Sequence, residues 1–152
     1  MKKRIAYISL YFFTVLLIFI LQKPLFMLYN GSIEKGFGPA EYMQVMVHGA
    51  SLDAATAGYL TALPFLLVLV SIWLKKFPLK KILWGYYILV ATLVSIVFVV
   101  DMALYTFWGF KLDASVFLYV DSPKEALASV STGFIALRVL IILLLIVLYA
   151  CL

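Results

Sequence analysis

The sequence is poor in charge, cysteine and histidine, and each shortage excludes a class of protein. Charged residues make up 12% of the 152-residue chain, whereas a soluble domain carries about 25%. The single cysteine, Cys151, has no second cysteine with which to form an internal disulfide. With one cysteine and one histidine, His48, the chain lacks the ligand set of a zinc site. We therefore expect neither a soluble domain, nor a disulfide-stapled domain, nor a zinc protein.

Hydrophobic residues, by contrast, make up 66% of the chain and gather in four long runs. A membrane-spanning helix needs about 20 apolar residues. We predict an all-α fold: a polytopic transmembrane helix bundle with short amphipathic surface helices on its outer face, forming a single transmembrane domain over residues 1–152. The expected spans are residues 5–29, 54–74, 82–107 and 134–152.

Two surface helices are expected on the outer side. Over residues 40–53 the polar residues recur at helical spacing opposite an apolar side, which is typical of a helix lying in the headgroup plane. The second begins at Ser122, where Pro123 and Glu125 complete a pattern of helix-start residues.

The positive charge marks the orientation of the chain. Seven of the twelve Lys and Arg residues lie in residues 2–4 and 75–81, flanking apolar runs. Such clusters favour the cytoplasmic side, so we expect a multi-pass protein with a cytoplasmic N-terminus. The positive charges form no face with interleaved stacking residues, and nucleic acid is therefore not an expected partner.

Four charged residues are predicted to lie at one depth, near the outer boundary of the hydrocarbon, given a rise of about 1.5 Å per helical residue. They are Lys23, Asp53, Asp101 and Arg138. Two interpretations stay open. Each residue is a boundary residue that reaches water along its own side chain, or together they form a pocket for a membrane phospholipid headgroup, with the two bases near the phosphate.

A repeat of small residues on the second span allows a close neighbour. Ala54, Gly58 and Ala62 recur every four residues, a spacing that lets another helix approach. The neighbour could belong to the same chain or to a second copy in a homo-oligomer.

The stretch 101–131 is rich in aromatic residues, and its segment from Trp108 to Asp113 is expected to break the third helix and turn. We predict that it forms a docking surface together with His48, which on its own is expected to be solvated or hydrogen-bonded. No nucleophile with a base and no metal cluster is evident, so no catalytic residue and no cofactor is assigned to this chain. The docking candidates are His48, Tyr105, Lys111, Asp113, Lys124 and Glu125.

One pattern of residues extends over most of the chain. It consists of His48-Gly49, Asp53, Ala57-Gly58-Tyr59-Leu60, Asp101, Tyr105, Trp108 to Ala114, Tyr119 and Ser122 to Ser131. This pattern resembles the membrane domain of lipoteichoic-acid-synthase-like proteins of the alkaline phosphatase and sulfatase superfamily, most of all the Bacteroidetes type. Ser51 departs from the pattern, since many relatives are expected to carry arginine there, so no anion contact is assigned to it.

The resemblance implies a bacterial cytoplasmic (inner) membrane protein whose bundle of about five spans precedes an extracytoplasmic catalytic domain. In the family, that domain binds a divalent metal such as manganese and transfers or hydrolyses phosphate or sulfate esters, glycerophosphate from phosphatidylglycerol among them. The present chain would then be a fragment that anchors the enzyme and presents its lipid substrate, with the missing domain as its partner.

Two other functions stay open: a small complete transporter or channel subunit, and a purely structural anchor or assembly partner. Against transport, no inverted repeat is visible in the sequence. No ionisable residue is expected at mid-bilayer either, where a transport site would lie.

Overall fold

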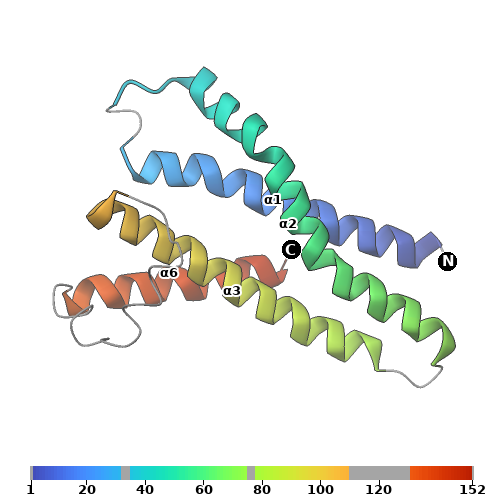
Figure 1. Ribbon diagram of the computed structural model, residues 1–152. Helices are drawn as coiled ribbons and strands as arrows, with labels where there is room; N and C mark the ends of the chain where they lie inside the picture. Colours follow the sequence, from blue (N-terminus) through green and yellow to red (C-terminus); the bar gives the residue numbers. More distant parts are fainter. Residues whose placement is uncertain (1, 32–34, 75–77, 110–130, 152) are drawn as a thin grey trace. The chain divides into compact units, whose positions relative to one another are not determined.

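The computed structural model describes residues 2–31, 35–74, 78–109 and 131–151, and within these ranges the chain is helical without strands. All four helices are long and apolar enough to cross a membrane. The expected all-α class and the prediction of a multi-pass membrane protein are therefore confirmed. The helices are α1 (Lys2–Tyr29), α2 (Pro39–Trp73), α3 (Leu79–Trp108) and α6 (Thr132–Cys151) (Figure 1).

The second helix is longer than its expected span. Residues 40–53, expected as a separate surface helix, are the first part of α2, which runs without a break from Pro39 to Trp73. The helix starts with proline in its first turn, and the Gly38 N–H donates to Glu41 Oε2 at 2.8 Å. No proline interrupts it before Pro64, so nothing in the backbone separates residues 40–53 from the span. The second expected surface helix, from Ser122, lies outside the described residues.

The chain divides into two compact units, residues 1–86 and 87–152. In the first, α1 and α2 cross in contact with each other (Figure 1). The α1 helix ends where the Asn30 side-chain amide donates to the Phe26 carbonyl at 2.9 Å and Gly31 takes a φ of 69°. Glycine adopts this left-handed conformation at little cost. The chain can then reverse toward α2.

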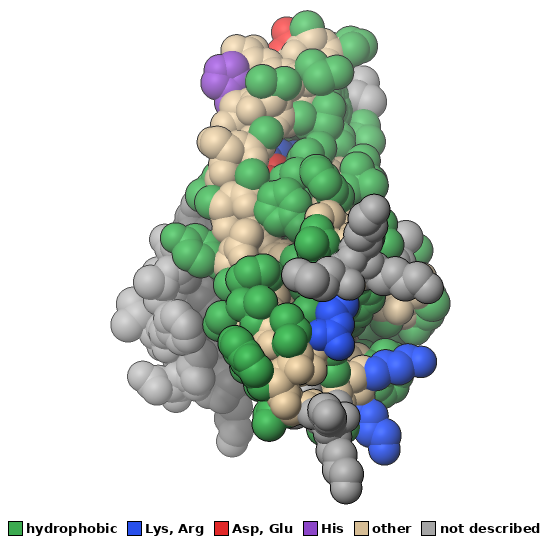
Figure 2. All heavy atoms as spheres, turned by 90° about the vertical axis from the view of Figure 1, so that its right-hand side faces the viewer, with side chains coloured by type: hydrophobic (Ala, Val, Ile, Leu, Met, Phe, Trp, Pro, Cys, Tyr) green, Lys and Arg blue, Asp and Glu red, His purple; other side chains and the backbone are tan. Residues whose placement is uncertain are grey.

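One face of α2 is buried in this unit. Its members recur every three or four residues, as one side of a helix requires. They are Asp53, Ala57, Thr61, Pro64 and Val68. Most other large apolar side chains of α1 and α2 are exposed, and hydrophobic side chains make up much of the surface in Figure 2. An apolar exterior is what helices in contact with lipid require.

In the second unit, α3 carries the buried residues. Ser95 is among them, and its hydroxyl donates to the Ala91 carbonyl at 2.7 Å, which satisfies the one buried polar side chain there among the described residues. At its end, the Gly109 N–H donates to the Tyr105 carbonyl at 3.0 Å, and Gly109 has a φ of 72°. The end of α3 at Trp108 agrees with the start of the predicted break, and the rest of that segment lies outside the described residues.

Candidate polar site between α1 and α2

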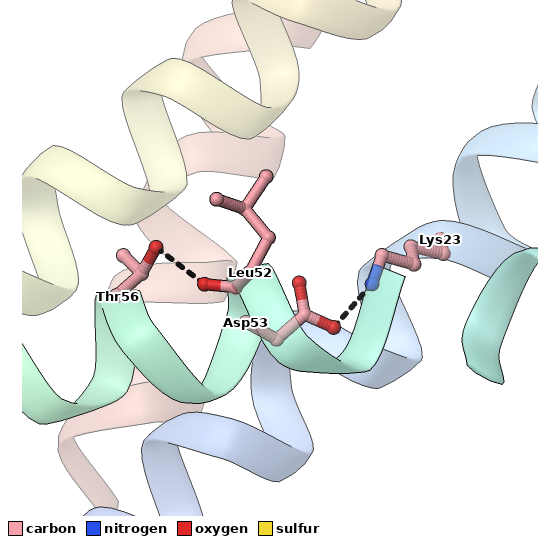
Figure 3. Close-up of polar contacts among 4 residues, drawn as sticks. All are labelled: Lys23, Leu52, Asp53 and Thr56. Atoms are coloured by element: carbon pink, nitrogen blue, oxygen red, sulfur yellow. Dashed lines mark hydrogen bonds and ion pairs between the residues drawn. The ribbon is translucent and has the colours of Figure 1, made fainter. Parts of the chain in front are cut away.

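An ion pair joins the two helices of the first unit. The Lys23 ammonium of α1 donates to Asp53 Oδ2 of α2, 30 positions further along the chain (Figure 3). The lysine side chain is 20% exposed and the aspartate side chain 11% exposed. The sequence analysis placed Lys23 and Asp53 at one level, and in the structure the two groups meet directly. Their position in a membrane stays a prediction.

Gly49 makes room for this contact. A methyl group at position 49 would collide with the Lys23 ammonium and would stand 2.6 Å from Lys23 Cε. Gly49 lies one helical turn before Asp53, on the same side of α2. The lysine side chain therefore crosses α2 over a position without a side chain and reaches the carboxylate in the next turn.

The Lys23–Asp53 pair lies near one end of the apolar segment of α1 and near one end of the apolar segment of α2. Lys23 follows Arg4 by 19 residues, or about 28 Å of helix, and Asp53 precedes Trp73 by 20 residues, or about 30 Å. These lengths match the hydrocarbon thickness of about 30 Å. A single charge in hydrocarbon costs about 2.5–3.5 kcal/mol. Because Lys23 and Asp53 pair with each other at the expected edge of the hydrocarbon, both side chains can be partly buried at less than the free-energy cost of two isolated charges.

Both members of the pair retain hydrogen-bonding capacity. An ammonium has three N–H donors, and among the described residues Asp53 is the only recorded acceptor for Lys23. Within the same part of the chain, no partner is recorded for Asp53 Oδ1. The nearby Thr56 hydroxyl donates to the carbonyl of Leu52 at 2.9 Å within its own helix (Figure 3). The site thus offers donors and an acceptor side by side.

The other two members of the predicted charged set belong to the second unit. Asp101 is half-buried on α3, and Arg138 is half-buried on α6 with its guanidinium carbon 4.6 Å from the centre of the Phe134 ring. At this distance the cation is attracted to the ring face. The convergence of all four residues on one pocket stays a prediction.

Of the six docking candidates, two lie in described parts of the chain. His48 is exposed on α2, and its Nδ1 lies 2.8 Å from the Gln44 carbonyl. Because a carbonyl oxygen only accepts, Nδ1 carries the proton in this contact. Tyr105 is half-buried in the last turn of α3. The other four, Lys111, Asp113, Lys124 and Glu125, fall outside the described residues.

Within the first unit, the small-residue repeat of α2 does not form the expected close helix contact. A methyl group added at Gly58 would meet nothing within 4 Å, and Ala62 is exposed, so no helix of the first unit approaches closely there. The buried small residue is Ala57. Contact of this repeat with a second copy stays a prediction.

Sequence reasoning missed the role of Gly49, although the pattern contained a clue. A glycine one turn from the acidic residue marks a gap on the face that carries the acid.

No three His, Cys, Asp or Glu side chains in the described ranges are grouped so that they could hold a metal ion.

Comparisons with known proteins find no matching family model, no similar curated protein and no similar solved structure.

Proposed function

We propose that this chain is the membrane domain of a phosphoglycerol-transferase-like or sulfatase-like enzyme, which anchors that enzyme and presents a phospholipid headgroup to its extracytoplasmic domain. The observation that carries the proposal is the Lys23–Asp53 pair, held between two apolar helices about one bilayer thickness from Arg4. The motifs over residues 48–131 support the enzyme class. In this role the chain binds and positions lipid, and catalysis belongs to the extracytoplasmic domain.

The pair suits an anionic headgroup that also carries hydroxyl groups. The N–H donors of Lys23 beyond the one used by Asp53 can donate to phosphate oxygens. Asp53 Oδ1 can accept from a headgroup hydroxyl. Phosphatidylglycerol has both groups, whereas phosphatidic acid lacks the glycerol hydroxyls and phosphatidylcholine has neither net negative charge nor hydroxyls. The proposed preference is therefore for phosphatidylglycerol.

Native mass spectrometry of the purified chain tests the lipid part of the proposal. The chain is supplied with equal amounts of phosphatidylglycerol and phosphatidylcholine of matched acyl chains, and the bound lipid is counted. Lys23→Met keeps the apolar stem and removes the charge, and we expect the phosphatidylglycerol molecule bound at this pair to be held about tenfold more weakly, as for the loss of one charged hydrogen bond. Lys35→Met, at an exposed lysine outside the helices, is the matched control and should bind as the parent does.

Asp53→Leu, measured with phosphatidic acid added to the lipid mixture, separates headgroup binding from simple loss of structure. This variant keeps the lysine charge and removes both acceptor oxygens, whereas asparagine would keep one. Phosphate binding should therefore persist while the preference for phosphatidylglycerol over phosphatidic acid disappears. Lipid selectivity equal to that of the unmodified chain in both Lys23→Met and Asp53→Leu would contradict the role of the pair.

The proposed enzyme class is tested on the protein that the complete reading frame encodes. We expect its translation to continue into a further span and a metal-binding domain. Supplied with manganese, the full product should act on glycerophosphate or sulfate esters, whereas the 152-residue chain alone should not. A stop codon directly after Leu152, or activity of this chain alone, would refute it.

A further inference from the structure

A groove runs between α1 and α2 in the part of the first unit nearer the N-terminus. Its volume is about 480 Å³, within the range of about 300–1,000 Å³ that small-molecule sites occupy. It is open along one side and lined by Ile8, Ser9, Phe12, Phe13, Gly58, Thr61, Ala62 and Phe65.

The lining of the groove is mostly apolar: three of its eight residues are phenylalanines, and its two hydroxyl-bearing residues are Ser9 and Thr61. Phe12 and Phe13 meet edge to face with ring centres 5.4 Å apart, and Phe13 and Phe65 are 63% and 48% exposed. Thr61 adds little polarity, because its hydroxyl donates to the Ala57 carbonyl at 2.7 Å within its own helix. Gly58 leaves open space, since a methyl group there would meet nothing within 4 Å. An occupant of this groove must therefore be apolar.

A cation lies at the membrane-surface end of the groove. Arg4 is exposed and precedes Ile8 and Phe12 on the same stripe of α1, at i, i+4 and i+8. Four residues place it about 6 Å along the axis from Ile8. Figure 2 shows most of the visible Lys and Arg side chains in the lower half of the face drawn there, with one further basic side chain next to an acidic one in the upper half. The groove thus has hydrocarbon character along its length and positive charge at its end.

An apolar groove with a positive charge at its end matches a phospholipid in both polarity and charge. A phospholipid has a negative phosphate at the membrane surface and an acyl chain directly beneath it. We propose that the groove binds one acyl chain of an anionic phospholipid of the leaflet on the N-terminal side, with Arg4 contacting the phosphate. The site is independent of the proposed function, because Lys23 lies 19 residues further along α1, near the opposite leaflet.

The test compares lipid retention by the full chain and by variants that fill the groove or remove its charge. The purified protein is supplied with phosphatidylglycerol and phosphatidylcholine of the same chains, in the Lys23→Met background so that the first site is silenced. Native mass spectrometry counts the lipids that stay bound. Gly58→Leu places a side chain in the groove, and we expect about tenfold less retained lipid of either kind, as for the loss of a few buried methylenes. Gly85→Leu is the matched control, since Gly85 of α3 also has open space around it and does not line the groove.

Arg4→Gln tests the headgroup contact. We expect it to lower phosphatidylglycerol retention about fivefold, the effect of one basic residue at a membrane surface, and to leave phosphatidylcholine unchanged. Lys80→Gln, at another exposed basic residue, controls for general surface charge. Equal losses in Arg4→Gln and Lys80→Gln would overturn the role of Arg4.

The oligomeric state distinguishes a lipid from a second protein copy as the occupant. Light scattering in detergent is measured for each variant. If Gly58→Leu alters the oligomeric state and leaves lipid retention unchanged, a second copy occupies the groove and the proposal is wrong. Should Gly58→Leu fail to fold, Ala62→Phe fills the same groove from an exposed position, and retention equal to the parent's would overturn the proposal.

Discussion

The Tyr86 hydroxyl donates a hydrogen bond of 2.7 Å to the carbonyl oxygen of Leu60. In a regular helix this carbonyl accepts from the N–H four residues later, but position 64 is a proline, which has no N–H. Tyr86 belongs to the first turns of α3, which are part of the first unit, and it takes the place of the missing helix donor in α2. An unsatisfied carbonyl is costly inside a membrane, so the proline of one helix and the tyrosine of another form a matched pair.

Phenylalanine at position 86 should weaken this junction. We expect Tyr86→Phe to lower the free energy of unfolding in detergent by about 1–2 kcal/mol, because the Leu60 carbonyl loses its donor. In a Pro64→Ala background the restored N–H satisfies the carbonyl, so the same change should cost less than about 0.5 kcal/mol. Tyr59→Phe, at a residue that is 82% exposed, is the control and should be nearly neutral. Equal costs of Tyr86→Phe in the two backgrounds would refute the pairing.

The interaction between Lys23 and Asp53 should itself contribute to the free energy of unfolding. Lys23→Ala and Asp53→Ala should each destabilise by about 2 kcal/mol, since each leaves a partly covered charge without its partner. The exchange Lys23→Asp with Asp53→Lys should recover part of this loss. Unfolding in detergent measures all three variants and their coupling. Additive effects would show that the two side chains do not interact.

Alanine at position 49 should disturb the Lys23–Asp53 ion pair by steric clash, without changing any charge. Glycine-to-alanine changes inside helices commonly stabilise by about 0.5–1 kcal/mol, and we expect this gain at Gly85, which has open space around it. At Gly49 the added methyl group displaces the Lys23 ammonium, so the gain should vanish or reverse. In a Lys23→Ala background it should return. Equal stabilisation by Gly49→Ala and Gly85→Ala would contradict the contact.

If each of the four apolar helices crosses the membrane once, the two described ends of the chain lie on the same side of it. Cys151 is exposed and is the single cysteine, so it serves as a native label site. A membrane-impermeant maleimide should reach Cys151 only after the membrane is opened, if the basic clusters lie in the cytoplasm. In a Cys151→Ala, Lys35→Cys variant the label should react with intact cells. The reverse pattern would invert the proposed orientation.

Much of the fold and part of the site could be predicted from residue types alone. Apolar runs long enough to span a bilayer identify helices whatever their neighbours are, and the break at Gly109 follows from local backbone preference. Lys23 and Asp53 could be placed at one depth because rise along a helix is fixed. Their direct contact could not, since it depends on which sides of α1 and α2 face each other.

The sequence by itself therefore determined the all-α class, the four helices apolar enough to span a membrane and the common level of Lys23 and Asp53 along them, because hydrophobicity, chain length and helical rise are local properties. Only the tertiary structure decided the rotation of α2. The small residues expected to pack were Ala54, Gly58 and Ala62, but the buried face runs through Asp53, Ala57 and Thr61. A shift of one residue turns a helix by about 100°. That rotation places Asp53 against Lys23, with Gly49 leaving room for the lysine, and leaves Gly58 and Ala62 to line the groove.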